Sequence, residues 1–248
     1  MTARIRLIAL AVMLAVAAMC AATPTDPLSR FAPTGGYVVE EYGLNCFNHT
    51  TKNFDWVLEY LTEASLVANV KREGDFYTDV DLPKVQQVHP GDYTNSGLDR
   101  GHGACSRYHR RTLSENASTF SMRNMMAQVP RLNRVELKAL EEEIAGFVVD
   151  GNTVWVLTAP VWYSDKSKIT VETFGDPHVW IPTHCLKAVL IRHLDTTYEC
   201  KTWLIPNVDD VQAFDTYRCT AAYGQAKSGL DLWAWLPDDV EKQIELTK

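Results

Sequence analysis

Two long apolar runs separated by a short polar turn constrain the fold of this chain most strongly. The runs cover 186–194 and 198–205, and Asp195-Thr196-Thr197 separates them. Both contain β-branched or aromatic residues, a pattern typical of a β-hairpin in an antiparallel sheet. Segments of the same kind at 37–41, 56–60 and 153–161 extend the expected sheet.

One segment has the period of a helix instead. Across 133–147, apolar residues recur at spacings of three, four and three, at Leu137, Leu140, Ile144 and Phe147. This stripe predicts an amphipathic helix. A second helix is expected near 230–236, ended by Pro237. The chain is therefore expected to adopt an α+β fold, with a central antiparallel sheet and flanking helices.

The first 22 residues are predicted to be a leader. Arg4 and Arg6 precede an apolar run, 7–19, that is too short to span a bilayer and is followed by small residues. We interpret 1–22 as a cleavable signal peptide, which predicts a secreted protein or one in the lumen of the secretory pathway. The mitochondrial intermembrane space is the alternative destination.

Composition places the remainder among ordinary globular proteins. The chain has 248 residues, of which 46% are hydrophobic and 22% charged, and it contains no repeat or low-complexity stretch. We expect an N-terminal extension at 23–36 and one domain at 37–248, with no membrane span in the mature chain.

Cysteines add an expectation of disulfides. Cleavage of the leader would leave five cysteines, at positions 46, 105, 185, 200 and 219. An odd count in a secreted chain predicts two disulfides and one thiol that is free or intermolecular, in a pairing that the sequence does not choose. On the expected hairpin Cys200 would face about residue 191, roughly six residues out of register with Cys185, which disfavours that bridge.

Positive charge is concentrated between Asp99 and Lys138. The whole chain has a formal charge of -7, yet this segment holds eight basic residues against three acids, which gives a local charge of +5. A basic segment on an otherwise acidic body is typical of a groove that binds a polyanion. A solvated basic face without a partner is the alternative.

A candidate general base lies inside this segment. Asn95-Ser96-Gly97 predicts a turn just before Asp99-Arg100-Gly101-His102. An imidazole beside guanidinium groups has a lowered pKa and stays neutral near pH 7, the form that accepts a proton from water. His102 fits that role, although a single histidine is more often structural. His109 is expected at the rim or in solvent.

Two further polar side chains belong to the expected helix. Glu141 lies four residues after Leu137 and three before Ile144, so it projects from the apolar side, where a carboxylate needs a reason. Asn133 lies near the helix start. An amide oxygen together with a carboxylate in the outer shell suits Mg²⁺, which prefers oxygen ligands and keeps several waters.

These motifs together resemble a known family. The segment DRGH at 99–102 follows DYTNSG at 92–97, and RN at 123–124, QVPRLNR at 128–134 and LE at 140–141 come after it. The set resembles the DNA/RNA non-specific endonucleases with a ββα-metal core, most closely their endonuclease G branch. Similar stretches are KREGDF at 71–76, IPTHCLKAVLI at 181–191 and SGLDLW at 228–233. Ala127 and Leu137 depart from the branch, which usually has Pro and Trp there.

The resemblance implies roles for matching residues. It implies that His102 is the general base and that Asn133 is the one direct protein ligand of Mg²⁺, with Mn²⁺ as an alternative metal. Glu141 would hold a water of the metal's shell, and Asn124 would orient the site. Arg72, with Arg100 as the weaker candidate, would stabilise charge on the reacting phosphate.

The implied activity is hydrolysis of phosphodiester bonds in DNA, RNA or both, with little sequence specificity, because such a site contacts phosphates more than base edges. A catalytically silent nucleic-acid-binding relative is the alternative. The resemblance leaves open whether the protein forms a homodimer, as close relatives often do.

Overall fold

The computed structural model describes residues 28–247 apart from 34–35, 73, 165–170 and 177. The expected signal peptide, 1–22, and part of the expected extension therefore lie outside the described residues. Within the described residues, no helix is both long and apolar enough to cross a bilayer.

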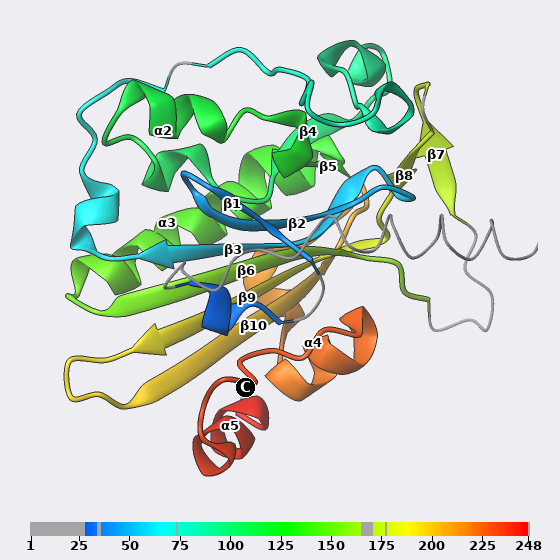
Figure 1. Ribbon diagram of the computed structural model, residues 1–248. Coiled ribbons are helices and arrows are strands. Elements are labelled where there is room, and N and C mark those ends of the chain that lie inside the picture. Colours follow the sequence, from blue (N-terminus) through cyan, green and yellow to red (C-terminus); the bar gives the residue numbers. More distant parts are fainter. Residues whose placement is uncertain (1–27, 34–35, 73, 165–170, 177, 248) are drawn as a thin grey trace, which may run out of the picture.

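A seven-stranded sheet forms the centre of the molecule (Figure 1). Every neighbouring pair in it is antiparallel. In spatial order the strands are β1 (Val38–Glu40), β2 (Gly43–Asn48), β3 (Asn53–Leu61), β6 (Thr153–Val161), β9 (His184–Arg192), β10 (Tyr198–Pro206) and β11 (Arg218–Cys219). The five apolar runs correspond to β1, β3, β6, β9 and β10, whereas β2 and β11 escaped prediction. The expected α+β class with a central antiparallel sheet is confirmed.

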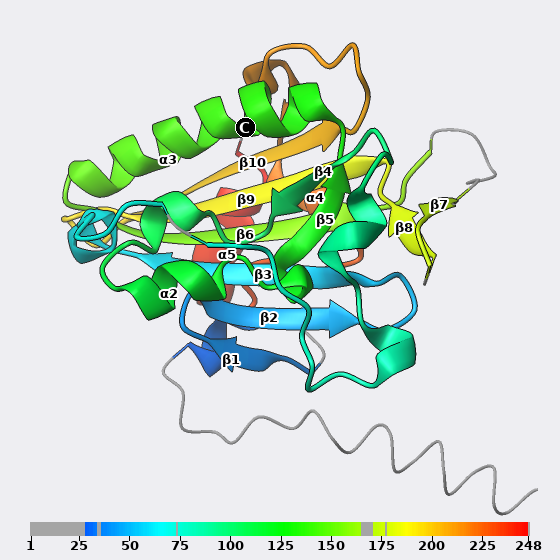
Figure 2. The same cartoon turned by 90° about the horizontal axis from the view of Figure 1, so that it is seen from above.

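Helices cover both faces of this sheet (Figure 2). The helices α2 (Leu113–Ser118) and α3 (Lys138–Val149) lie on one face, and α4 (Ala221–Ser228) and α5 (Asp238–Glu245) on the other. Alternate residues of the central strands enter two separate cores: Val156 packs with the α3 residues, and Leu157 with the α5 side. Because both faces are buried, these strands are continuous apolar runs.

The hairpin of β9 and β10 shows whether Cys185 and Cys200 can form a disulfide. Cys200 pairs with Leu190 and Cys185 with Ile205, so the expected lack of a bridge between these two cysteines is confirmed. They also enter opposite cores. The thiols of Cys105, Cys185 and Cys200 are buried and form no disulfide. Since at most one pair of the five remains, the expectation of two disulfides is wrong.

The helix expected over 133–147 is present, but its first part is a π-helical turn, η7 (Leu132–Leu137), which runs directly into α3. The helix expected near 230–236 is wrong, because that segment forms turns between α4 and α5. Gly229 and Trp233 have φ angles of +75° and +67°, which a right-handed helix excludes. The apolar pattern there reflects burial of Leu232, Trp233 and Leu236 against the sheet.

Two small sheets lie beside the large one. One pairs β4 (Asp99–His102) with β5 (Met125–Gln128), and the other pairs β7 (Glu172–Phe174) with β8 (Val179–Ile181). The β4–β5 pair leads into η7 and α3, which forms a β-β-α unit. Asn207, after β10, anchors this unit to the large sheet: its amide donates to the carbonyl of Ala127 (3.0 Å) and accepts from the N–H of Val129 (2.8 Å).

Gly103, directly after β4, lies tightly against the large sheet, which leads to a first prediction. A Cβ atom there would lie 2.8 Å from Cγ2 of Val57 and 2.9 Å from both Oδ1 of Asn124 and Cε1 of Phe54. We expect Gly103→Ala to lower the free energy of unfolding by about 1–3 kcal/mol, as overpacking does. Gly146→Ala in α3, where no atom lies within 4 Å, is the matched control and should be neutral or slightly stabilising. Equal thermal unfolding of the two variants would contradict the proposed contact.

Candidate functional site

A cavity of about 600 Å³ lies between strand β4, helix η7–α3 and the segment around Arg72. Five of the six predicted site residues line it: Arg72, Arg100, His102, Asn133 and Glu141. The imidazole of His102 and the amide of Asn133, 31 positions apart in sequence, thus face one space. Asn124 is completely buried and does not line the cavity.

His102 lies at the end of β4 against two aromatic rings. Its ring centroid is 5.8 Å from that of Phe76 and 5.3 Å from that of Phe120. Its Nε2 atom is buried and has no hydrogen-bond partner within the described part of the chain. Burial, followed by the positive charges of Arg72 and Lys187, lowers the pKa of the imidazole to about 3. At neutral pH the ring is therefore neutral and able to accept a proton.

Asp99 orients the amide of Asn133. The Nδ2 atom of Asn133 donates to Oδ2 of Asp99 at 2.9 Å. An ionised carboxylate only accepts hydrogen bonds, so the amide nitrogen must face Asp99 and the amide oxygen faces away from it. Burial alone would raise the pKa of Asp99, but hydrogen bonds from Arg134 and Asn133 lower it. The oxygen of Asn133 is left available as a ligand.

The π-helical turn affects which residues of the helix face the cavity. In a regular α-helix, the eight residues from Asn133 to Glu141 make about 2.2 turns and leave the two side chains about 80° apart. The wider i→i+5 turn of η7 lies between them, and both residues line the cavity. Burial raises the pKa of Glu141, whereas the charge of Lys187 and a hydrogen bond with the Cys105 thiol oppose the rise.

Asn124 fixes the chain that follows His102. Its Oδ1 accepts the N–H of Ala104 at 2.8 Å, and its Nδ2 donates to the carbonyls of Ala104 (3.0 Å) and Thr119 (2.8 Å). The backbone carbonyl of Asn124 accepts the N–H of Gly103 at 2.8 Å. This arrangement suits a residue that positions the site from behind.

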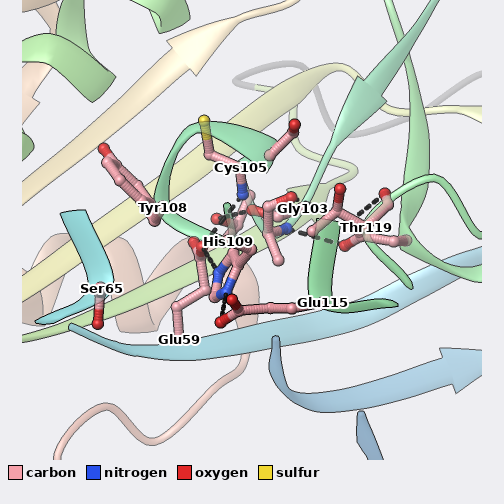
Figure 3. Close-up of polar contacts among 12 residues, drawn as sticks. Glu59, Ser65, Gly103, Cys105, Tyr108, His109, Glu115 and Thr119 are labelled. Carbon is pink, nitrogen blue, oxygen red and sulfur yellow. Dashed lines mark hydrogen bonds and ion pairs between the residues drawn. The ribbon is translucent and has the colours of Figure 1, made fainter. Parts of the chain in front are cut away.

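The large sheet holds the same peptide from below. Thr158 on β6 donates to the carbonyl of Gly103 (2.9 Å), and Lys187 on β9 donates to Thr158 (2.7 Å). Glu59 on β3 accepts the N–H of Cys105 at 3.1 Å (Figure 3). These three side chains, which we call the polar stripe, are at most 1% exposed and cross three adjacent strands.

His109 closes this network and differs from expectation. It is 3% exposed, so the prediction of a rim or solvated position is wrong. Its Nε2 lies 2.9 Å from Glu59, and its Nδ1 lies 3.5 Å from Glu115 (Figure 3). Burial would lower the pKa of His109, but the two carboxylates raise it. The buried imidazole of His109 therefore bridges the carboxylates of Glu59 and Glu115, which favour its protonated form.

Comparisons with known proteins show the family of the chain. Residues 31–239 match the family model described as DNA/RNA non-specific endonuclease. The chain belongs to that family. The match confirms the resemblance noted from the motifs and the expected endonuclease class, and the family is one of metal-dependent nucleases.

Relatives of this endonuclease include nucleases from several organisms. It is 29% identical over 199 residues to human "Endonuclease G, mitochondrial", which covers 77% of this chain and 67% of that protein. It is 32% identical over 154 residues to a nuclease from Nostoc, covering 60% of this chain and 54% of that protein. A crystal structure of an EndoG/EndoGI complex has the same fold, with a TM-score of 0.81 at 24% identity over 92% of this chain and 97% of that one.

The polar stripe is the part of the candidate site that sequence reasoning missed. Lys187 lies in the middle of an apolar strand, and Glu59 lies in another, which were visible signals. A buried lysine in a central strand is uncommon without a partner, and here the partners are the hydroxyl of Thr158 and the carbonyl of Gly103, the residue after His102.

Lys187 generates a prediction about His102. Replacement of the buried ammonium in Lys187→Met removes one of the charges that disfavour imidazolium, so the pKa of His102 should rise from about 3 toward its ordinary value of 6.5. The rise should be partial, because burial and Arg72 remain. The measurement is an NMR titration of the labelled histidine ring, with Lys201→Met on β10 as the control. An unchanged His102 titration in Lys187→Met would rule out the electrostatic link.

Proposed function

We propose that this protein is a metal-dependent endonuclease that hydrolyses phosphodiester bonds in DNA, RNA or both, with little sequence specificity. The observation that supports it most is that a neutral imidazole, that of His102, and an oriented amide oxygen, that of Asn133, line one cavity rimmed with cations. Because cations recognise phosphates rather than base edges, such a cavity is suited to cleavage without sequence readout.

His102 is the proposed general base. In the free protein its low pKa keeps it neutral, since Arg72 and Lys187 repel a proton. A phosphate bound beside Arg72 would offset that positive charge, which raises the affinity of the ring for a proton when substrate is present. His102 would thus become a stronger base when substrate is bound.

Asn133 and Glu141 are the proposed metal-site residues. Within the described chain no three His, Cys, Asp or Glu side chains form a metal cluster, so a metal here must rely on few protein ligands. The oxygen of Asn133 faces away from Asp99, and Glu141 lines the same cavity, which fits a hydrated Mg²⁺ or, alternatively, Mn²⁺. A bound Mg²⁺ would supply Lewis-acid stabilisation of phosphate oxygens.

The two arginines proposed to bind the reacting phosphate differ in how firmly other residues hold their guanidinium groups. The guanidinium of Arg72 lies over the ring of Phe120 at 5.5 Å, and it makes no ion pair with the described residues. Arg100 donates to the carbonyl of Pro90 and stacks over Phe76 at 4.9 Å, so it is held in place. We assign charge stabilisation at the reacting phosphate to Arg72, and a weaker share to Arg100.

We retain the predicted processing as part of the proposal: a cleaved signal peptide at 1–22, an extension at 23–36 and a nuclease domain at 37–248. Curated relatives include nucleases named mitochondrial, which favours the intermembrane space as much as secretion. N-terminal sequencing of the natural product decides the processing. The homodimer also stays a prediction.

The role of His102 is tested by plasmid nicking. His102→Ala should reduce the nicking rate of supercoiled plasmid by at least about 10²-fold while leaving folding and DNA binding intact, because only proton transfer is lost. His193→Ala, at the distant β9–β10 turn, is the control. Undiminished nicking by His102→Ala would remove it as the base, and DNA binding without any product from the wild type would favour the silent relative.

The metal proposal is tested separately on Asn133. Asn133→Ala should raise the Mg²⁺ concentration needed for half-maximal nicking about tenfold or more, because the one direct protein ligand is gone. Gln243→Ala, an exposed amide on α5, should behave as wild type. EDTA should stop the wild-type reaction. A wild-type enzyme indifferent to chelator, or an Asn133→Ala variant with unchanged metal dependence, contradicts this assignment.

A further inference from the structure

A chain of charged side chains passes through His109, and none of its members lines the cavity. It runs from Glu59 on β3 through His109 to Glu115 on α2 and ends at Arg111 (Figure 3). Arg111 is half exposed, whereas the other three side chains are at most 5% exposed. These four side chains, which we call the ion chain, connect the large sheet to the surface through the turn that follows His102.

The charge of Glu59 depends on His109. The Oε1 atom of Glu59 accepts the N–H of Cys105 at 3.1 Å and lies 2.9 Å from Nε2 of His109. The Oε2 atom has no hydrogen-bond partner in the described part of the chain, where His109 is also the one residue that forms an ion pair with Glu59. A fully buried carboxylate without a cation takes up a proton or destabilises the fold. Loss of the imidazolium would therefore weaken the acceptor that holds Cys105.

The same ring faces the carboxylate that holds the far end of the turn. The Nδ1 atom of His109 lies 3.5 Å from Oε1 of Glu115. Glu115 accepts the backbone N–H of Arg111 at 3.0 Å and a guanidinium N–H of the same residue at 2.6 Å. Both ends of the 103–111 turn, at Cys105 and Arg111, are thus bonded to carboxylates that the ring of His109 bridges.

A neutral ring cannot serve both carboxylates, because neutral imidazole has one donor and one acceptor whereas a carboxylate only accepts. Burial lowers the pKa of His109, but the hydrogen bonds and charges of Glu115 and Glu59 raise it. Tyr42 also faces the ring, at 6.3 Å between ring centroids, and stays neutral because burial raises its pKa well above the usual range. Arg111 reaches the ring only through Glu115. When His109 loses its proton, an acceptor nitrogen therefore comes to face an acceptor oxygen.

We propose that His109, protonated between the two carboxylates, is a positioning residue that holds the 103–111 turn, and through it His102, against the sheet. The proposal rests on the proposed nuclease function and adds to it a second histidine, one that does not touch the substrate. Cys105 is only three residues after His102, so a weaker hydrogen bond to the N–H of Cys105 loosens the peptide that carries the proposed base. Misplacement of a base lowers turnover more than substrate binding.

The first test uses the wild-type protein. Its labelled histidine rings are titrated by NMR from pH 6.5 upward, and kcat and KM for a fluorogenic oligonucleotide are measured over the same range at constant Mg²⁺. We expect kcat to fall where His109 loses its proton, KM to change less than about twofold, and the ring signals of His102 to inflect at that pH. With its pKa of about 3, His102 does not itself titrate in this range. Absence of the His102 inflection overturns the proposal.

Two variants at the outer end of the ion chain separate charge from packing. Glu115→Gln removes one of the carboxylates that raise the pKa of His109, so its NMR titration and the fall in kcat should both move about one pH unit lower. Arg111→Met breaks the ion pair with Glu115 but keeps both carboxylates, so the pKa of His109 should stay or rise. Glu63→Gln, at an exposed position outside the cavity, should match the wild type.

Thermal unfolding provides a further readout with a defined sign. A raised histidine pKa contributes stability that is complete below pH 6.5 and is lost as the pH rises through the pKa of the folded protein. The difference in Tm between the wild type and Glu115→Gln should therefore shrink as the pH rises above 6.5. A difference that is constant with pH would show that Glu115 stabilises the fold without the proton of His109, which contradicts the proposal.

The outcomes separate this role from the function on which it rests. If the wild type cleaves DNA or RNA but the fall in kcat does not follow the titration of His109 in Glu115→Gln, the positioning role is wrong and the nuclease stands. If the wild type cleaves nothing, the proposed function fails. In that case, a His102 inflection that moves with His109 in Glu115→Gln still supports the link between the two histidines, and a fixed or absent inflection overturns it. If Glu115→Gln does not fold, the wild-type titration decides.

Discussion

The peptide from Gly103 to Cys105 must be held rigidly, and the rest of the site depends on that constraint. The β4–β5 pair has only four residue pairs, too few for a stable two-stranded sheet in water. It is held because Asn124, Thr158 and Glu59 bond the backbone groups of this peptide up to the N–H of Cys105, and the carbonyl of Cys105 accepts the N–H of Tyr108. Burial of charged groups costs free energy, and these hydrogen bonds offset part of that cost.

The buried charge of Lys187 also affects the pKa of His102. Lys187 supports the Gly103 peptide and also lowers the pKa of His102. Arg72 acts on His102 from the cavity side. In the proposed mechanism, these two cations keep the imidazole of His102 neutral until a phosphate binds. The polar stripe therefore holds the Gly103 peptide in place and contributes to the low pKa of His102. A substitution of Lys187 should affect both.

The sequence predicted those strands and helices whose apolar pattern follows directly from which faces are buried. The runs that became β6, β9 and β10 and the helix around Leu140 were visible because both faces of the sheet and one face of the helix are apolar. The segment 230–236 failed because its apolar residues fill a core from a turn with positive φ angles, which periodicity does not reveal. The buried position of His109 depends on its contact with Glu59, 50 residues earlier, so the sequence around His109 could not predict it.

The candidate site was predictable as a set of residue types but not as an arrangement. Spacing put Asn133 and Glu141 on one helix, yet a regular helix would leave them on different faces. The π-helical turn that changes this is held by contacts remote in sequence. Glu136 accepts from Arg131 five residues earlier, the spacing of a π-turn, and from the N–H of Phe214 at 3.0 Å.

The loop after β10 therefore affects the geometry of the proposed metal site, although it does not line the cavity. Arg131 also donates to the carbonyl of Val211 at 2.8 Å, so both ends of the widened turn are tied to this loop. A helix relaxed to the regular α-helical period would rotate Asn133 relative to Glu141 and separate its oxygen from the cavity. Since the stabilising partners lie about 80 residues downstream, the alignment of these two side chains is a property of the whole fold and not of the motif in which they occur.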